Sequence, residues 1–335
     1  MLDRHREVPY RLHWLALGLA VFGSGCFGNG PRIDRDVQFT IHQESALTYY
    51  ETGDLDRAED QALRGIAIKK KDTPLRLLLG WIQLRRGTTD ALFKARGVFE
   101  SMADEHDPRA ELGLGETLER ISIVNRETAA SLENGERFIA KDKLANRTAE
   151  LRREARNLLR QATDAYGRVL ERQPDDLKAL NGMQRAFSLL DENETALEYS
   201  MRLIEVANSE RDALRKHLSD PGRDLDDSQE QNLRELARST ESLLGETYLF
   251  ASSINVRLKR YEKALEHLES ASKIRPRQAD LASRRAQVLY ELGRYEQSIE
   301  DVMTFVRLSD KPFDHPDIRR AWDLKHRAES QLGPQ

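Results

Sequence analysis

The chain has 335 residues, of which 33% are charged and 7% aromatic, and its formal net charge at pH 7 is -4. Both signs of charge are mixed along the whole length, so the sequence offers no basic stripe for phosphate neutralisation and argues against a nucleic-acid partner. The single cysteine, Cys26, excludes an internal disulfide and a thiolate metal cluster. Ala, Leu, Glu and Arg dominate and runs of Val, Ile or Thr are few, which predicts an all-helical fold.

The first 25 residues have the order of a secretory signal. A charged start is followed by the apolar run Trp14–Phe22 and by the small residues before Cys26. The run is about nine residues long, whereas a membrane-spanning helix needs about 20. We therefore expect residues 1–25 to be a cleaved signal and not a permanent transmembrane helix.

The end of this segment resembles a bacterial lipobox, in which small residues precede a cysteine that becomes lipid-modified. Ser24, Gly25 and Cys26 fit that pattern, but Gly23 departs from it, since a branched apolar residue is usual there. The resemblance implies export, lipidation of Cys26 and anchoring to a bacterial membrane, with Phe27 favouring the outer membrane facing the periplasm. The alternatives are an ordinary signal with an incidental cysteine, or a misassigned start codon.

Two helical units are predicted early in the mature chain. Residues 26–38 contain Gly28, Gly30 and Pro31 and are predicted to be a flexible tether, and residues 39–335 to be one helical domain. The first unit has its turn at Gly53-Asp54-Leu55, with Ala58 and Ala62 as small packing residues. The second begins at Leu79-Gly80-Trp81 with its turn at Gly87, and Thr88–Asp90 predicts an extra helical turn or a lengthened loop.

A repeat of 34 residues is clearest near the C-terminus. Arg260-Tyr261-Glu262-Lys263-Ala264-Leu265 is followed 34 residues later by Arg294-Tyr295-Glu296-Gln297-Ser298-Ile299. Ala162 and Ala196 fall in the same phase, and each of these small residues is predicted to open a helix whose apolar residues recur at three- and four-residue steps.

The repeat resembles the tetratricopeptide repeat family, whose unit is a 34-residue helix-turn-helix. Two stretches carry the second-helix motif with its terminating proline: Ala264, Leu268, Ala271 and Pro276, and Ala162, Tyr166, Val169 and Pro174. The resemblance implies an all-α solenoid of helical hairpins in a superhelix.

Two stretches and the C-terminus depart from the repeat. Residues about 116–160 predict lengthened helices that project beyond the solenoid. Residues about 209–241 predict a second insertion, with a loop over 209–227 and one long helix from Ser228 to Lys259. Residues about 315–332 predict a polar capping helix, which a stacked array needs at its end.

No motif in the sequence predicts catalysis, a metal or a cofactor. No two histidines have the one-turn spacing of a zinc-binding helix. Asp224, Asp226 and Asp227 crowd a loop but lack the offsets of a calcium loop. Gly113-Leu114-Gly115 lacks the Lys and Ser or Thr of a phosphate loop and is better explained by tight helix packing. No carboxylate stands in an apolar neighbourhood that would raise its pKa.

The predicted function is that of a membrane-anchored interaction scaffold of the bacterial cell envelope, with no enzyme activity and no small-molecule substrate. Its partner would be another protein, bound as an extended peptide or a helix in the concave groove. The alternatives are an accessory or regulatory subunit of an envelope enzyme or of an assembly or secretion machine, a cryptic hydrolase, and a structural spacer. By the family's first-helix pattern, the partner-binding residues are Tyr50, Leu77, Trp81, Asn181, Arg185, Gln287 and Tyr290.

Two alternatives stay open for these residues. Trp81 and Tyr290 are equally compatible with packing between neighbouring units. Arg185 and Asn181 lie four residues apart on one helical face, where they would hold a carbonyl or a carboxylate of a partner, but Arg185 is also placed to pair with a neighbouring glutamate.

Overall fold

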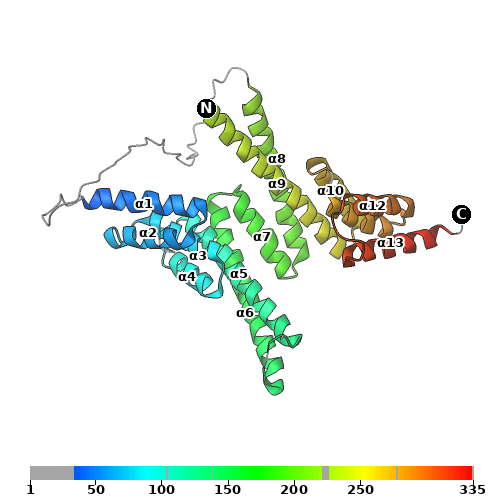
Figure 1. Cartoon of the computed structure of the whole chain (residues 1–335), viewed down its shortest axis with the longest axis horizontal. Helices are drawn as coiled ribbons and strands as arrows, with labels where there is room; N and C mark the ends of the chain where they lie inside the picture. Colours follow the sequence, from blue (N-terminus) through cyan, green and yellow to red (C-terminus); the bar gives the residue numbers. More distant parts are fainter. Residues whose placement is uncertain (1–33, 103–104, 138, 221–225, 277, 334–335) are drawn as a thin grey trace.

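The structure is a computed structural model that describes residues 34–102, 105–137, 139–220, 226–276 and 278–333. These residues form thirteen α-helices and no strand (Figure 1). The helices are α1 (Arg35–Thr52), α2 (Leu55–Ile68), α3 (Thr73–Arg86), α4 (Thr89–Glu100), α5 (Pro108–Glu133), α6 (Lys141–Arg172), α7 (Leu177–Leu189), α8 (Asn193–Ser219), α9 (Asp227–Arg257), α10 (Tyr261–Ile274), α11 (Ala279–Glu291), α12 (Tyr295–Leu308) and α13 (Pro316–Leu332). The predicted all-α fold is confirmed.

The helices form an elongated array of antiparallel hairpins. Each helix packs against its neighbours in the chain, and the first helices of the early hairpins, α1, α3, α5 and α7, also contact one another in that order. They therefore form a continuous layer, which we call the first-helix layer. Two lengthened hairpins, α5–α6 and α8–α9, project from the array in opposite directions (Figure 1).

No helix in the described part of the chain is long and apolar enough to cross a membrane. Cys26, the signal segment and most of the predicted tether lie outside the described residues. The tether is shorter than expected at its other end, because α1 already begins at Arg35, with the Asp34 carboxylate accepting a hydrogen bond from the backbone N–H of Asp36 at 3.0 Å.

Local turn chemistry fixes the ends of the early helices. Gly53 ends α1 in the left-handed region (φ 84°), and the Asp54 carboxylate caps α2 by accepting from the backbone N–H of Arg57 at 3.1 Å. Gly87 ends α3 in the same way (φ 69°), and Thr88 directly caps α4. The expected insertion at Thr88–Asp90 is therefore wrong, because Thr88 is the N-cap and the next two residues are the first turn of α4.

The four small residues in phase with the repeat are all fully buried. Ala162, Ala196, Ala264 and Ser298 each have 0% exposure, so each allows close helix approach, as predicted. Ala196, Ala264 and Ser298 lie in the first turn or two of their helices, but Ala162 lies two thirds of the way along α6. The expectation that Ala162 opens a helix is wrong, because α6 is extended N-terminally by the projection.

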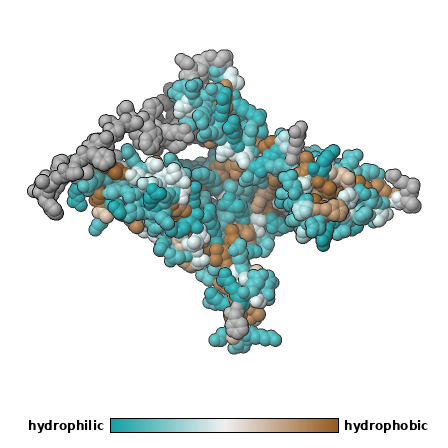
Figure 2. Space-filling view, viewed as in Figure 1, coloured by the Kyte–Doolittle hydropathy of each residue, from teal (hydrophilic) through white to brown (hydrophobic). Residues whose placement is uncertain are grey.

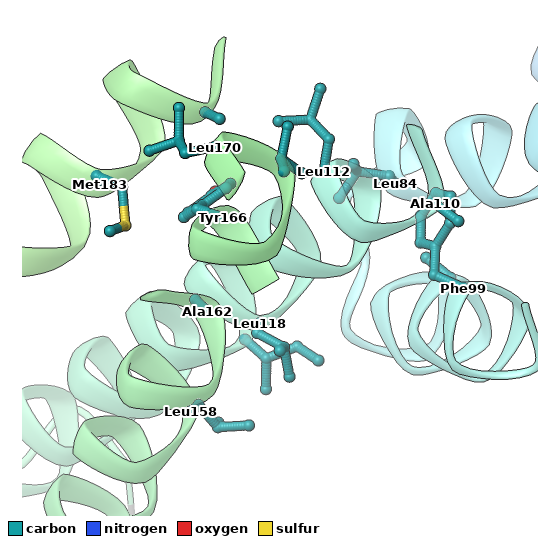
Figure 3. Close-up of a cluster of buried hydrophobic side chains, with 14 of the residues drawn as sticks. Leu84, Phe99, Ala110, Leu112, Leu118, Leu158, Ala162, Tyr166, Leu170 and Met183 are labelled. Carbon is teal, nitrogen blue, oxygen red and sulfur yellow. The ribbon is translucent and has the colours of Figure 1, made fainter. Parts of the chain in front are cut away.

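Aromatic rings inserted against glycines hold the central hairpins together. A Cβ atom at Gly80 or at Gly113 would lie 2.6 or 2.4 Å from the Phe99 ring, and one at Gly115 or Gly182 would lie 2.6 or 2.4 Å from the Tyr166 ring. Phe99 on α4 thus packs against the backbones of α3 and α5, and Tyr166 on α6 against those of α5 and α7. Figure 3 shows both rings within the central apolar cluster. The explanation of Gly113 and Gly115 by tight packing is confirmed.

The second insertion differs from its prediction. Residues 209–219 were expected in a loop, but they continue α8 to Ser219, since Leu214 is buried and Pro221 is the first helix breaker. The predicted long helix over 228–259 corresponds to α9 (Asp227–Arg257), whose N-terminus has a capping box between Asp226 and Gln229. The predicted capping helix corresponds to α13, which has Ile318, Ala321, Leu324 and Ala328 on its buried side and charged residues outward.

Candidate functional site

The most distinctive polar site of the first-helix layer joins α5, α6 and α7. Glu119 on α5 is 5% exposed, and the Arg185 guanidinium on α7 donates to both of its carboxylate oxygens, at 2.8 and 3.0 Å. The Tyr166 hydroxyl on α6 donates to the same carboxylate at 3.0 Å. A two-pronged guanidinium contact fixes both position and orientation of the pair.

Protonation of this cluster is fixed at neutral pH. Burial acts to lower the pKa of Arg185, but the hydrogen bonds and charge of Glu119 raise it further than burial lowers it. Burial raises the pKa of Tyr166, and the Glu119 charge adds to the effect. Arg185 therefore remains a cation and Tyr166 a neutral hydrogen-bond donor, so neither is a candidate acid or base at neutral pH.

Glu116 lies one turn before Glu119 and is a partly buried carboxylate for which the structure shows no hydrogen-bond donor. Burial raises its pKa, although the charges of Arg185, Arg120 and Lys178 partly oppose the shift. The expectation that no carboxylate has such surroundings is therefore wrong. Its burial arises from tertiary packing of α5, which the local sequence around Glu116 does not specify.

Several polar atoms near this cluster also have no hydrogen-bond partner in the structure. They are Oγ of Ser122 and Nδ2 of Asn125 on α5, and Oε1 of Gln184 on α7. Gln184 is 2% exposed and Ser122 0%. A buried polar atom left unsatisfied costs about 1–3 kcal/mol. These three atoms have essentially no exposed surface, so they lie within the helix packing and are not open to a ligand at the surface.

The predicted residues Asn181, Arg185 and Trp81 lie in or next to this region, but their side chains are engaged within the chain. Arg185 pairs with Glu119, and Asn181 accepts a hydrogen bond from Gln184 at 2.7 Å. Trp81 is half-buried and packs edge-on against Phe99, with ring centroids 5.5 Å apart. The glutamate alternative for Arg185 describes what the structure shows, whereas the ring contact of Trp81 is with Phe99 of its own hairpin, α3–α4.

The remaining four predicted residues do not join this site. Tyr50 lies on α1, with the Arg85 guanidinium 5.1 Å from its ring centroid. Leu77 is 4% exposed, which corrects its prediction as a partner contact, because it faces the core of α3–α5. Gln287 is exposed and donates to Glu291. Tyr290 packs edge-on against Tyr295 and is covered by Arg327 of α13.

Glu116 and Glu119 were not predicted as site residues. Both look like ordinary surface carboxylates of a long helix in the sequence, and the one available signal was Gly115 beside them, which predicts close approach of another helix. The described residues contain no group of three or more His, Cys, Asp or Glu side chains placed to hold a metal ion. The cluster is satisfied internally by the contacts of Glu119 with Arg185 and Tyr166, so Glu116 beside it is the carboxylate open to an external donor.

Comparison with known proteins gives one family match. Residues 245–278, which span the end of α9 and all of α10, match the tetratricopeptide repeat family. This segment contains Ala264, Leu268, Ala271 and Pro276, the residues on which the sequence resemblance was based. No curated protein matches the chain.

Solved structures with similar helical arrays are distant in sequence. A tetratricopeptide repeat protein of Thermus thermophilus is 14% identical, with 75% of this chain and 99% of that chain covered and a TM-score of 0.43. One from Parabacteroides merdae is 14% identical, with 87% and 99% covered and a TM-score of 0.38. PilF of Pseudomonas aeruginosa is 11% identical, with 89% and 91% covered and a TM-score of 0.39.

The family match and the hairpin architecture agree with each other. The matched segment is itself a helical hairpin, and its Ala264, Leu268 and Ala271 are buried in the contact with the next hairpin. The other hairpins repeat this arrangement with insertions in α5–α6 and α8–α9. Residues 245–278 therefore form a tetratricopeptide repeat within an all-α array of helical hairpins.

Proposed function

We propose that the chain is a non-catalytic scaffold that binds a segment of a partner protein along the first-helix layer at α5 and α7. Stacked helical hairpins present extended binding surfaces of this kind. The observation that carries the proposal is the half-buried Glu116 carboxylate beside the Arg185–Glu119 pair, for which the described residues show no hydrogen-bond donor. A backbone amide or a cationic side chain of a bound segment would donate a hydrogen bond to this carboxylate.

The test is a binding measurement with a partner captured by crosslinking in native membranes. Glu116→Gln removes the charge of the half-buried carboxylate and is expected to weaken binding by about tenfold, as is usual for a charged hydrogen bond lost at an interface. Glu127→Gln is the matched control, because Glu127 is exposed on the same helix. Equal affinity of the two variants and the unaltered chain would place the binding surface elsewhere.

We further propose that the scaffold is tethered to a bacterial membrane, at the cell envelope, through a lipid on Cys26. The support is the order of charged, apolar and small residues before that cysteine. Cys26→Ser is expected to move the protein from the membrane to a soluble exported fraction. Mass spectrometry of the mature N-terminus decides the question, since an unmodified N-terminus at another residue contradicts the proposal.

A further inference from the structure

One exposed face of α6 carries four arginines on the projecting hairpin. Arg152, Arg153, Arg156 and Arg160 are all exposed, and together with Ala149 and Asn157 they line a shallow hollow. Steps of three and four residues place these side chains on one side of the helix. Another side of α6 packs against α5, and the side that carries the arginines is exposed to solvent. We call this surface the arginine face.

The arginine face is not neutralised by the rest of the chain. Arg152 pairs with Glu133 at 2.6 Å, but Arg153, Arg156 and Arg160 form no ion pair with any described residue. Other helices compensate their cations with an acid one turn away, as in these pairs: Arg64–Asp60, Lys94–Asp90, Arg96–Glu100, Arg234–Glu230 and Lys325–Glu329. Like charges one turn apart destabilise a helix by a few tenths of a kcal/mol per pair. Carboxylates of another molecule would relieve this repulsion by pairing with the three arginines.

The surroundings of the arginine face limit the shape of its ligand. Glu150 and Glu154 lie along one edge, and Asp164 follows Arg160 by one turn. These carboxylates would repel a polyanion that continues past the arginines, such as a nucleic-acid strand or an anionic bilayer. A short acidic segment avoids them. Guanidinium groups also match carboxylates in a two-pronged geometry.

We propose that the arginine face of α6 binds an acidic segment of a partner protein, with carboxylates spaced about one helical turn apart. The surface is on the second helix of its hairpin and lies outside the first-helix layer, so it does not depend on the binding site proposed above. It would give the scaffold a second docking point, on an element that extends away from the array (Figures 1 and 2). Figure 2 shows the outer part of this projection as largely hydrophilic.

The probe is a fluorescein-labelled peptide with glutamates at three- and four-residue steps, titrated with the full chain and followed by fluorescence anisotropy. Arg153→Ala, Arg156→Ala and Arg160→Ala together are expected to lower the affinity about tenfold or more, because three exposed ion pairs are lost. The affinity of the unaltered chain is expected to fall steeply with added salt. Circular dichroism checks that the helices are retained.

The matched control removes three exposed arginines elsewhere: Arg238, Arg284 and Arg319, each changed to Ala, which alters the net charge equally. This control and Glu116→Gln are both expected to bind the peptide as tightly as the unaltered chain. Single-stranded DNA and phosphatidylserine vesicles are titrated in parallel. No binding of the peptide, an equal loss in the control, or tighter binding of DNA or vesicles through the same arginines would overturn the proposal.

Discussion

The packing of the central hairpins depends on four glycines. At each of them, the aromatic ring of another residue fills the space that a side chain would occupy. The Tyr166 ring lies so close to Gly182 that a Cβ there would come within 2.4 Å of it. Tyr166 is fully buried and its hydroxyl is held by Glu119, so the ring has no room to move away. We therefore expect Gly182→Ala to destabilise the chain by about 1–3 kcal/mol through overpacking, measured as a fall in the denaturant midpoint.

The same substitution at a glycine with open space around it is expected to have the opposite effect on stability. Gly167 is also helical, on α6, and a Cβ there meets nothing within 4 Å. Gly167→Ala is expected to stabilise the chain by up to about 1 kcal/mol, because alanine has the higher helix propensity. If both variants shift the midpoint in the same direction, the ring-on-glycine contacts do not determine the packing of the central hairpins.

The raised pKa of Glu116 predicts a pH-dependent stability. A carboxyl whose pKa is higher in the folded chain binds more protons folded than unfolded, so the stability of the chain falls as pH rises through that range. Glu116→Gln removes this contribution and is expected to raise the melting temperature at pH 7, with a smaller effect at about pH 4. Glu127→Gln is the control, and a lower melting temperature of Glu116→Gln at pH 7 would contradict the argument.

Small buried residues were predictable, whereas the exposure of large ones was not. Ala264 is recognised by its repeat phase, and Ala58 and Ala62 by their place after the turn at Gly53-Asp54-Leu55; each of the three is fully buried. For Trp81 and Tyr290 the sequence left partner binding and packing between units equally open, and each of the two packs against another ring. An aromatic residue suits a core and a binding surface equally well, so its type and spacing do not decide between them.

At the scale of the helix, the sequence predicts those helix ends that are set by a local glycine or N-cap residue. It does not predict a helix length that depends on packing against another helix. The turn at Gly53 and Asp54 follows from a left-handed glycine and an N-cap. The continuation of α8 over residues 209–219 depends on contact with α9, which buries Leu214. That contact joins two separate helices, and the sequence of α8 alone does not reveal it.

The outer half of α6, which lies in the projecting part of the α5–α6 hairpin, is expected to be less stable than the inner half. Its outer core contains Ala129, Leu132 and Leu151 with two half-buried residues, while the inner half of α6 carries Tyr166 in the central cluster. Local opening requires less free energy where fewer apolar contacts are broken. Hydrogen exchange is therefore expected to be much faster over residues 141–150 than over residues 158–170, and uniform protection along α6 would contradict this.

At the scale of the whole molecule, the apolar core of the described residues is divided into clusters, several of which join neighbouring hairpins. The central cluster extends over α3–α8, a second joins α9, α10 and α11, and a third joins α11, α12 and α13. The stability of such an array is approximately a sum of unit terms and nearest-neighbour terms. Damage in one cluster should therefore spread to the adjoining hairpins before it reaches the distant ones.

Substitution of Ala264 tests this nearest-neighbour behaviour. Ala264 is fully buried in the α9–α11 cluster, so Ala264→Glu introduces both excess volume and an unpaired buried charge, at a cost of about 3 kcal/mol or more. Hydrogen exchange is expected to accelerate over α9–α12 and to remain slow over α3–α7. Lys263→Glu is the control, because Lys263 is exposed on the same turn of α10 and its charge reversal leaves the core intact. Loss of protection over the entire chain in Ala264→Glu would contradict nearest-neighbour behaviour. α10 is not part of the central cluster, so such a loss would show that the array unfolds as one cooperative unit.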